Sequence, residues 1–407
     1  MSALKQGCRG RFELSFITTL LFFILSLPML ILAYHHVAVS PLFEEATGFR
    51  YFYSLRILYS AERPWLPQGQ LPGIINIGIQ YILTACGYSI TKAQPRIDLF
   101  SYISAIIPMA ISAVAYFWAA LPLRTNSARL LLAVAILATT YAYSLRMFFP
   151  FWNTVPDYMN WFPIVSILSI GAAFRLLSSA HTKVWSFKNA SWLGVFLGAS
   201  ITIKVTLFIF PFTLACMMLF QDKRFLLSLG YAFQSFIVGC VLFIVITWIY
   251  YLGSTQATLD FFPTTLSFMH TSRIDILFKD WLLQLKPISA SDFTYFAVLL
   301  PMISLIFGVF NPKARILLST LPASLLYLTL LFKRFYWVTI LEVQFFSLFL
   351  AVTIVFLLSK IMKSEWFNSK LRLLLGFILV AMIWYAQPLK SIASVLQYYQ
   401  QFNTASE

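Results

Sequence analysis

The chain has 407 residues, of which 60% are hydrophobic and 11% are charged, and its mean hydropathy is +0.81. A soluble domain carries about 25% charged residues, so this composition excludes an ordinary soluble domain and predicts a surface that faces lipid. The net charge of +15 does not indicate nucleic-acid binding, because the basic residues of a membrane protein first serve its orientation and its contacts with headgroups.

Several apolar runs reach the roughly 20 residues that a helix needs to cross the hydrocarbon core of a bilayer. Helices satisfy their backbone hydrogen bonds internally, whereas barrel strands give a far weaker hydropathy signal. The sequence therefore predicts an all-α polytopic transmembrane bundle of roughly 10–11 spans, with residues 1–407 as a single integral membrane domain. The four cysteines lack metal-ligand spacing and are interpreted as small buried hydrophobes.

The first predicted element is a helix over residues 14–34, which follows Lys5, Arg9 and Arg11 and is expected to be retained with its N-terminus inside. Residues 71–90 are expected to lie along the membrane surface. Residues 190–220 are too long for one crossing and are expected to form two, with a turn near Lys204. Further spans are predicted over residues 98–120, 128–149, 157–178, 226–251, 293–311, 314–332, 336–359 and 371–390.

The basic residues orient these spans. With 71–90 lying flat, every predicted inner loop is basic and holds almost no acid, which is the positive-inside pattern. A crossing at 71–90 would invert all the loops that follow. The basic residues of the inner loops are Arg124, Arg129, Arg175, Lys183, Lys188, Lys223, Arg224, Lys313, Arg315, Lys360, Lys363, Lys370 and Arg372. This topology leaves two long outer segments, residues 35–97 with amphipathic helices and residues 252–292.

The outer side also collects an unusual number of basic residues. Because outer loops normally avoid Lys and Arg, this excess predicts a bound anion, and a phosphate or pyrophosphate group pairs well with these side chains. The alternative is that they are rim charges that reach toward lipid headgroups. Candidates for the anion site include Arg50, Arg96, Lys333 and Arg334.

Glu44 and Glu45 form an acidic pair soon after the first predicted span. Adjacent carboxylates repel, so one of them holds a proton near neutral pH or both share a cation. Either state suits a general base or a metal site. The alternative is that the pair only favours the start of the aromatic and basic segment GFRYFYSLRIL, which is typical of an interfacial helix.

Three more ionisable residues occupy notable positions. Asp157 follows Pro156 at the outer start of a span, where it serves either the helix start or a site. Lys204 and Glu342 lie inside apolar runs. An ionisable group at that depth is costly and is by default a functional candidate.

Taken in order, these features resemble the GT-C superfamily of polyprenyl-phosphate-dependent glycosyltransferases, which includes protein O-mannosyltransferases and lipid A aminoarabinose transferases. An acidic pair just after the first helix is typical of the family. The segment FEEATGF occupies that place, with Glu44 where the family usually has Asp. WLGVFLGASITIKVTLFIFPF is similar to the family's Gly-Leu-x-x-Leu-x-Lys segment, and KRFYWVTILEVQFF to its late Arg-aromatic segment.

The resemblance implies transfer of a sugar from a polyprenyl-phosphate carrier to a lipid, glycan or protein acceptor on the outer face. Glu44 and Glu45 would be base or metal ligands, and Asp157 a second acid or an acceptor-positioning group. Lys204, Arg334 and Lys333 would contact phosphate. Some family members use a divalent cation and others do not, and the sequence does not decide between them. We expect no counterpart of the family's C-terminal outer domain in these 407 residues, so acceptor recognition is expected to come from the loops.

Other functions stay open. A lipid-linked sugar flippase or small-molecule transporter would use Lys204 and Glu342 in its translocation path, although the repeated halves typical of transporters are not found in the sequence. A polysaccharide polymerase or ligase, or a structural membrane subunit, is a further alternative. The expected location is a bacterial inner membrane, because the sequence shows no disulfide framework and no outer glycosylation sequon. The positive-inside pattern predicts a cytoplasmic N-terminus.

Overall fold

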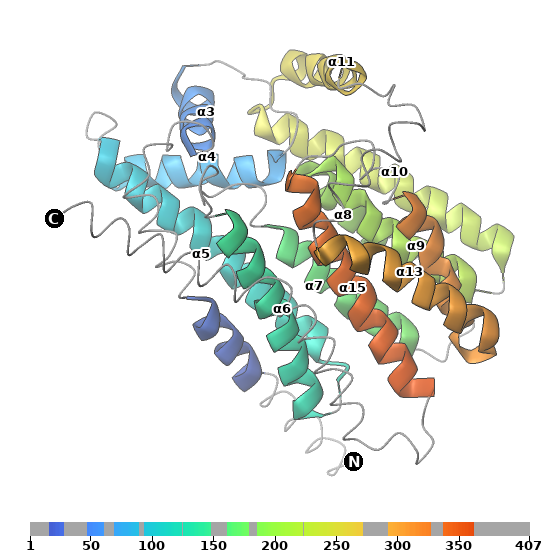
Figure 1. The fold of residues 1–407 in the computed structure, drawn as a ribbon. Coiled ribbons are helices and arrows are strands. Elements are labelled where there is room, and N and C mark those ends of the chain that lie inside the picture. Colours follow the sequence, from blue (N-terminus) through green and yellow to red (C-terminus); the bar gives the residue numbers. More distant parts are fainter. Residues whose placement is uncertain are drawn as a thin grey trace, which may run out of the picture.

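The computed structural model describes residues 16–27, 47–60, 69–88, 93–123, 125–147, 161–178, 185–222, 224–271, 292–326 and 337–361. Within these ranges all regular secondary structure is helical, which confirms the predicted all-α class (Figure 1). The labelled helices are α3 (Thr47–Tyr59), α4 (Gln70–Ala85), α5 (Ala93–Ala120), α6 (Asn126–Met147), α7 (Phe162–Ser178), α8 (Phe187–Ile203), η3 (Val205–Phe208), α9 (Ile209–Gln221), α10 (Phe225–Tyr250), α11 (Thr255–Thr271), α13 (Asp292–Phe310), η4 (Pro312–Thr320) and α15 (Trp337–Ile361).

Most predicted spans coincide with helices, and the predicted interruption at Lys204 is confirmed. Lys204 is extended, with φ −158° and ψ 136°, and separates α8 from the short 3-10 helix η3 that leads into α9. The first predicted span is described only over residues 16–27, and the span at 371–390 lies outside the described residues.

The predicted α-helical span over 314–332 is wrong at its start. Pro312–Thr320 forms the 3-10 helix η4. Asn311 caps it by accepting a hydrogen bond from the Lys313 backbone N–H at 3.0 Å, and Pro312 follows at its first position. Mean hydropathy does not distinguish this tighter winding from an α-helix, because it depends on composition and not on the number of residues per turn.

The order of contacts along the helices shows which helix ends lie together at each end of the bundle. Ser166 Oγ donates to Phe345 O at 3.0 Å, and the rings of Phe174 and Phe356 stack further along the same two helices, so α7 and α15 are parallel. Trp185 N–H donates to Asp222 Oδ2 at 3.1 Å, which brings the start of α8 beside the end of α9. Gln221 Nε2 at the end of α9 donates to Leu176 O near the end of α7 at 3.4 Å. The ends of α7 and α15 therefore lie toward the Asp222 end of the bundle, and their starts toward the Lys204 end.

Helices α8 and α10 pack closely because glycines stand at their contact. A Cβ added at Gly198 would lie 2.7 Å from Gly239 O, and one at Gly194 would lie 2.6 Å from Ser235 O. Ser235 Oγ also donates to Ala190 O at 2.9 Å. Residue numbers rise together along both helices, so α8 and α10 are parallel and α9 runs back between their ends. Small residues that let two backbones approach are typical of helix packing in lipid.

Helix α10 buries small and polar side chains and exposes large apolar ones, which is the reverse of a helix in a soluble protein. Its buried residues are mostly small or polar and include Ser228, Ser235, Gly239 and Thr247. Its exposed residues are large and apolar, with Leu226 82% and Phe233 64% exposed. This helix, and Pro95–Ala120 within α5, are long and apolar enough to cross a membrane by length and composition.

Three helices, α3, α4 and α11, form a cap layer at the Lys204 end. In Figure 1 α4 and α11 run nearly across the top of the view, whereas α5, α6 and α15 descend through the bundle. Gly73 of α4 touches the ring of Tyr250 at the end of α10. Tyr250, Tyr251 and Phe261 share an apolar cluster with Ile57 and Ile77, which joins the cap layer to α10.

We expect Gly198→Ala to destabilise the protein by about 1–3 kcal/mol, because the added methyl group would collide with the Gly239 backbone rather than with a flexible side chain. The matched control is Gly230→Ala on α10, where an added Cβ meets nothing within 4 Å. That substitution should be neutral or slightly stabilising, since Ala is the better helix former. Thermal unfolding of the purified full chain in detergent measures both, and equal melting temperatures for the two variants would contradict the packing described here.

Candidate functional site

Lys204, one of the site residues predicted from the sequence, lies between α8 and η3 at the end of the bundle where α7 begins. Its backbone N–H donates to Ser200 O at 3.0 Å, which closes α8, and Leu207 N–H donates to Lys204 O at 3.0 Å, which opens η3. The half-buried Lys204 ammonium lies 5.6 Å from the centroid of the Phe162 ring, at the first residue of α7. A cation over an aromatic face is attracted by the ring quadrupole.

The turn at Lys204 is packed beside α15. Phe210, near the start of α9, contacts Phe346 at 5.5 Å and Phe349 at 5.8 Å between ring centroids. The start of α7 and the middle of α15 therefore lie beside the segment that follows the turn. In the sequence Asp157 precedes α7, and Lys333 and Arg334 precede α15.

Of the remaining predicted site residues other than Arg96, two lie in described helices and five lie outside the described residues. Arg50 lies in α3 of the cap layer, and Glu342 lies in the first part of α15, between its start and Phe345. Glu44, Glu45, Asp157, Lys333 and Arg334 lie outside the described residues. The divalent-cation option concerns Glu44 and Glu45, so it stays a prediction. Within the described ranges no group of three or more His, Cys, Asp or Glu side chains is placed to hold a metal ion.

Arg96, predicted to bind substrate, donates hydrogen bonds to several acceptors of the protein itself. It is 0% exposed. Its Nε and Nη2 donate to Gln80 Oε1 at 3.0 and 2.9 Å, and Nη1 donates to Tyr88 O at 2.6 Å. Nη2 also reaches Gln80 O and Thr84 Oγ1, each at 2.9 Å. A phosphate group at Arg96 would have to displace these acceptors.

Tyr51 of α3 lies next to this guanidinium. Burial raises the pKa of the Tyr51 phenol, and the positive charge of the neighbouring Arg96 offsets part of that rise. The Tyr51 ring packs edge-on against Phe100 of α5 at 5.3 Å. The phenol therefore stays protonated at neutral pH and serves as a neutral neighbour of Arg96.

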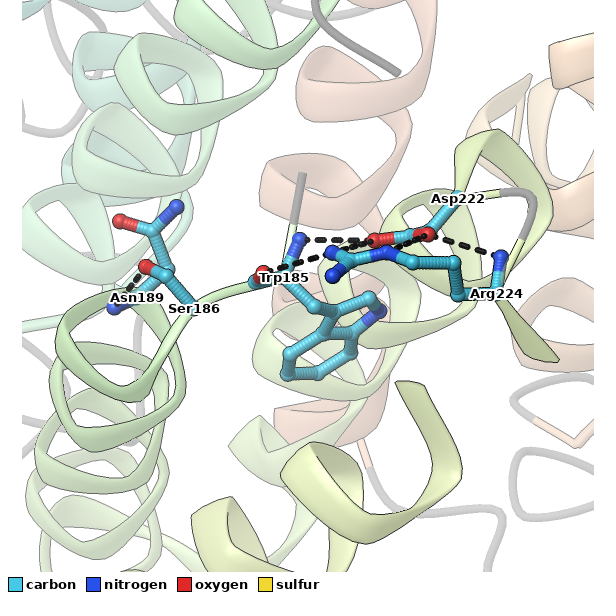
Figure 2. Close-up of polar contacts among 5 residues, drawn as sticks. All are labelled: Trp185, Ser186, Asn189, Asp222 and Arg224. Atoms are coloured by element: carbon cyan, nitrogen blue, oxygen red, sulfur yellow. Dashed lines mark hydrogen bonds and ion pairs between the residues drawn. The ribbon is translucent and has the colours of Figure 1, made fainter. Parts of the chain in front are cut away.

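The Asp222 end holds a polar cluster that the sequence did not single out as a site (Figure 2). Asp222 Oδ2 accepts from Trp185 N–H, and its Oδ1 accepts from the Arg224 backbone N–H at 2.9 Å. The Arg224 guanidinium pairs with the same carboxylate at 3.2 Å and donates to Trp185 O at 3.3 Å. Ser186 caps α8 by accepting from Asn189 N–H at 3.3 Å. These contacts join the starts of α8 and α10 to the end of α9 and leave no acceptor of Asp222 open for catalysis.

Asp222→Asn should lower the melting temperature, because the amide keeps one acceptor oxygen but loses the ion pair, at a cost of about 1–3 kcal/mol. Burial alone would raise the pKa of Asp222, but the hydrogen bonds from Arg224 and Trp185 and the Arg224 charge outweigh it and hold the pKa below its usual range. A depressed folded-state pKa means that the stabilisation is complete above the unfolded-state pKa of about 3.9. It is lost as the pH falls through the folded-state value.

Melting curves of wild type and Asp222→Asn should therefore differ at pH 7 and converge as the pH falls below about 4. Asp260→Asn is the matched control, since Asp260 is exposed and accepts from the Gln256 amide within its own helix. A difference between wild type and Asp222→Asn that persists unchanged at the lowest pH would contradict the role of the ionised carboxylate.

No protein-family model, curated protein or solved structure matches this chain. What indicates a function is therefore the set of the chain's own residues and their geometry. The Lys204 end combines a cation at a helix break with the starts of two helices that charged residues precede in the sequence, and this end is the candidate functional site.

Proposed function

We propose that this chain is an integral membrane glycosyltransferase that moves a sugar from a polyprenyl-phosphate carrier to an acceptor, with the Lys204 end on the outer side of the membrane. The observation that carries the proposal is the position of Lys204. Its ammonium lies at the break between α8 and α9, beside the first residue of α7. Such a cation suits the phosphate of a lipid-linked donor.

The surface of α10 supports the membrane part of the proposal. A soluble protein rarely exposes a long continuous apolar face, whereas α10 exposes Phe233, Phe236, Val241, Ile244 and Trp248 along its length. In lipid this face carries no penalty, and the small buried residues of α10 let α8 approach closely.

The charges of the described residues support the orientation. Lys313 and Arg315 lie at the start of η4, directly after α13. Lys188 lies in the first turn of α8 and Arg224 directly precedes α10, so both lie at the Asp222 end. The positive-inside rule assigns such an end to the cytoplasm. The Lys204 end then faces outward, where a lipid-linked sugar would meet its acceptor.

The chemistry follows from the residues assigned to the site. The acceptor hydroxyl oxygen attacks the anomeric carbon of the sugar, while the bond from that carbon to the phosphate oxygen breaks and the phosphate leaves with both electrons. Glu44 or Glu45 takes the hydroxyl proton as the new bond forms. Lys204, with Arg334 and Lys333 as further candidates, stabilises the negative charge on the departing phosphate. Asp157 would position the acceptor.

A lipid flippase or transporter is the second candidate, because helices interrupted near a charged residue also build transport sites. At Lys204, however, α9 turns back toward the start of α8 rather than continuing the crossing. The interruption is therefore a hairpin turn, which favours a site at one end of the bundle over a site at its centre.

Glu44→Gln or Glu45→Gln should reduce sugar transfer by about 10²–10⁴-fold, since loss of a general base costs a factor of this size. The measurement uses membranes that contain the protein at matched amounts, incubated with radiolabelled polyprenyl-phosphate sugars. Glu62→Gln is the matched control, because it makes the same chemical change in the same predicted outer segment. Transfer that both variants retain would reject the acidic pair as the base, and movement of labelled lipid across the membrane without transfer would favour the flippase.

A further inference from the structure

A single buried arginine connects three helices at the start of α5. Arg96 donates to the side chain and backbone of Gln80 and to Thr84 in α4, and to Tyr88 just beyond α4. Each of these acceptors is a neutral oxygen. The guanidinium lies beside the C-terminal part of α4, where a cation interacts favourably with the negative end of the helix dipole. This arrangement holds a charge without exposing it to solvent or to a ligand.

The same contacts extend to the last residue of α3 and to a second point in its first half. Thr84 Oγ1 donates to Gln80 O at 3.0 Å, so Tyr59 must supply the hydrogen of the short bond between the Tyr59 and Thr84 hydroxyls. In the first half of α3, Tyr51 O accepts a longer hydrogen bond of 3.5 Å from Gln80 Nε2. The Tyr51 ring packs on Phe100 of α5. Arg96 thus reaches α3 through Thr84 on one side and Gln80 on the other.

We propose that Arg96 is a positioning residue, and we call Arg96 with Gln80, Thr84, Tyr59 and Tyr51 the Arg96 lock. The lock fixes α3 and α4 of the cap layer to α5. In the sequence, α3 begins just after Glu44 and Glu45, so a fixed α3 gives the chain leading out of the acidic pair a fixed anchor. The contribution to transfer rests on the proposed function, whereas the lock itself is a property of the fold.

A phosphate contact and the Arg96 lock require different side-chain groups. A phosphate contact needs the Arg96 charge and is indifferent to the Thr84 hydroxyl. A lock needs the hydroxyl as well, because it accepts from Arg96 and from Tyr59 at once. Thr84→Val removes the hydroxyl at nearly constant volume, and Thr84→Ser keeps it, so this pair separates the two roles without altering any charge.

Hydrogen exchange of the full chain in lipid nanodiscs tests the lock without an activity assay. Loss of hydrogen bonds to a charged group should speed the exchange of α3 amides by roughly ten- to a hundredfold in Arg96→Gln and about tenfold in Thr84→Val. Thr84→Ser should exchange like wild type. Arg175→Gln is the control, because Arg175 also donates to backbone carbonyls, Gly171 O and Trp118 O, but at the other end of α5. Wild-type exchange of α3 in both Arg96→Gln and Thr84→Val would overturn the lock.

Transfer kinetics test the positioning role. Thr84→Val should lower kcat about tenfold with an unchanged KM for the lipid-linked donor, and Thr84→Ser should restore kcat. A raised KM in Arg96→Gln together with wild-type kinetics in Thr84→Val would instead make Arg96 a substrate contact and overturn the proposal. If wild type transfers no sugar, the proposed function fails and the exchange result still decides the lock.

Discussion

The close contact between α8 and α10 sets the positions of most other elements. The backbones approach because Gly194, Gly198 and Gly239 carry no side chain at the contact. Two parallel helices joined through α9 require α9 to run back along them, which puts Lys204 at one end and Asp222 at the other. The Asp222 cluster closes the second end with an ion pair and two backbone hydrogen bonds. Because α9 must connect the end of α8 to the start of α10, Lys204 lies at one end of the bundle and Asp222 at the other.

Polar residues inside the bundle are satisfied mainly by their own helices. Ser200, Thr213 and Thr353 each donate to the carbonyl one turn earlier, at 2.7 Å. Such local bonding lets a small polar side chain lie between helices without a partner from outside. Large apolar residues are then free to cover the outer surface, as on α10. On α10, small or polar residues face the bundle and large apolar residues face outward, and this arrangement is the one expected for a helix that lipid rather than water surrounds.

The sequence predicts the helical class and most helix positions, because long apolar runs carry that information directly. It also predicts the interruption at Lys204, since 190–220 is too long for one crossing. It does not predict η4, because mean hydropathy does not depend on the number of residues per helical turn. It also missed the α8–α10 contact, although the Gly194 and Gly198 spacing was visible, since the partner Gly239 lies on a helix distant in the sequence.

Arg96 shows the same limit for the candidate site. Its charge in an outer segment indicated an anion contact, but its acceptors Gln80 and Thr84 are ordinary polar residues of another helix. Sequence gives the charge of a residue, and only the fold gives its partner. For Lys204 the apolar run indicated a functional residue, which stays a prediction, and only the fold shows that its ammonium lies beside Phe162 at the start of α7.

The most direct test of a donor site at the Lys204 end is the affinity of the purified chain for a polyprenyl monophosphate that carries no sugar. The uncharged polyprenol serves as the reference ligand. Lys204→Met should weaken phosphate binding by roughly ten- to a hundredfold, the value of a hydrogen bond to a charged group, and leave polyprenol binding unchanged. Lys188→Met, which removes an exposed lysine near the Asp222 end, should bind like wild type. Equal affinity of wild type and Lys204→Met for the phosphate would contradict a donor site at the Lys204 end.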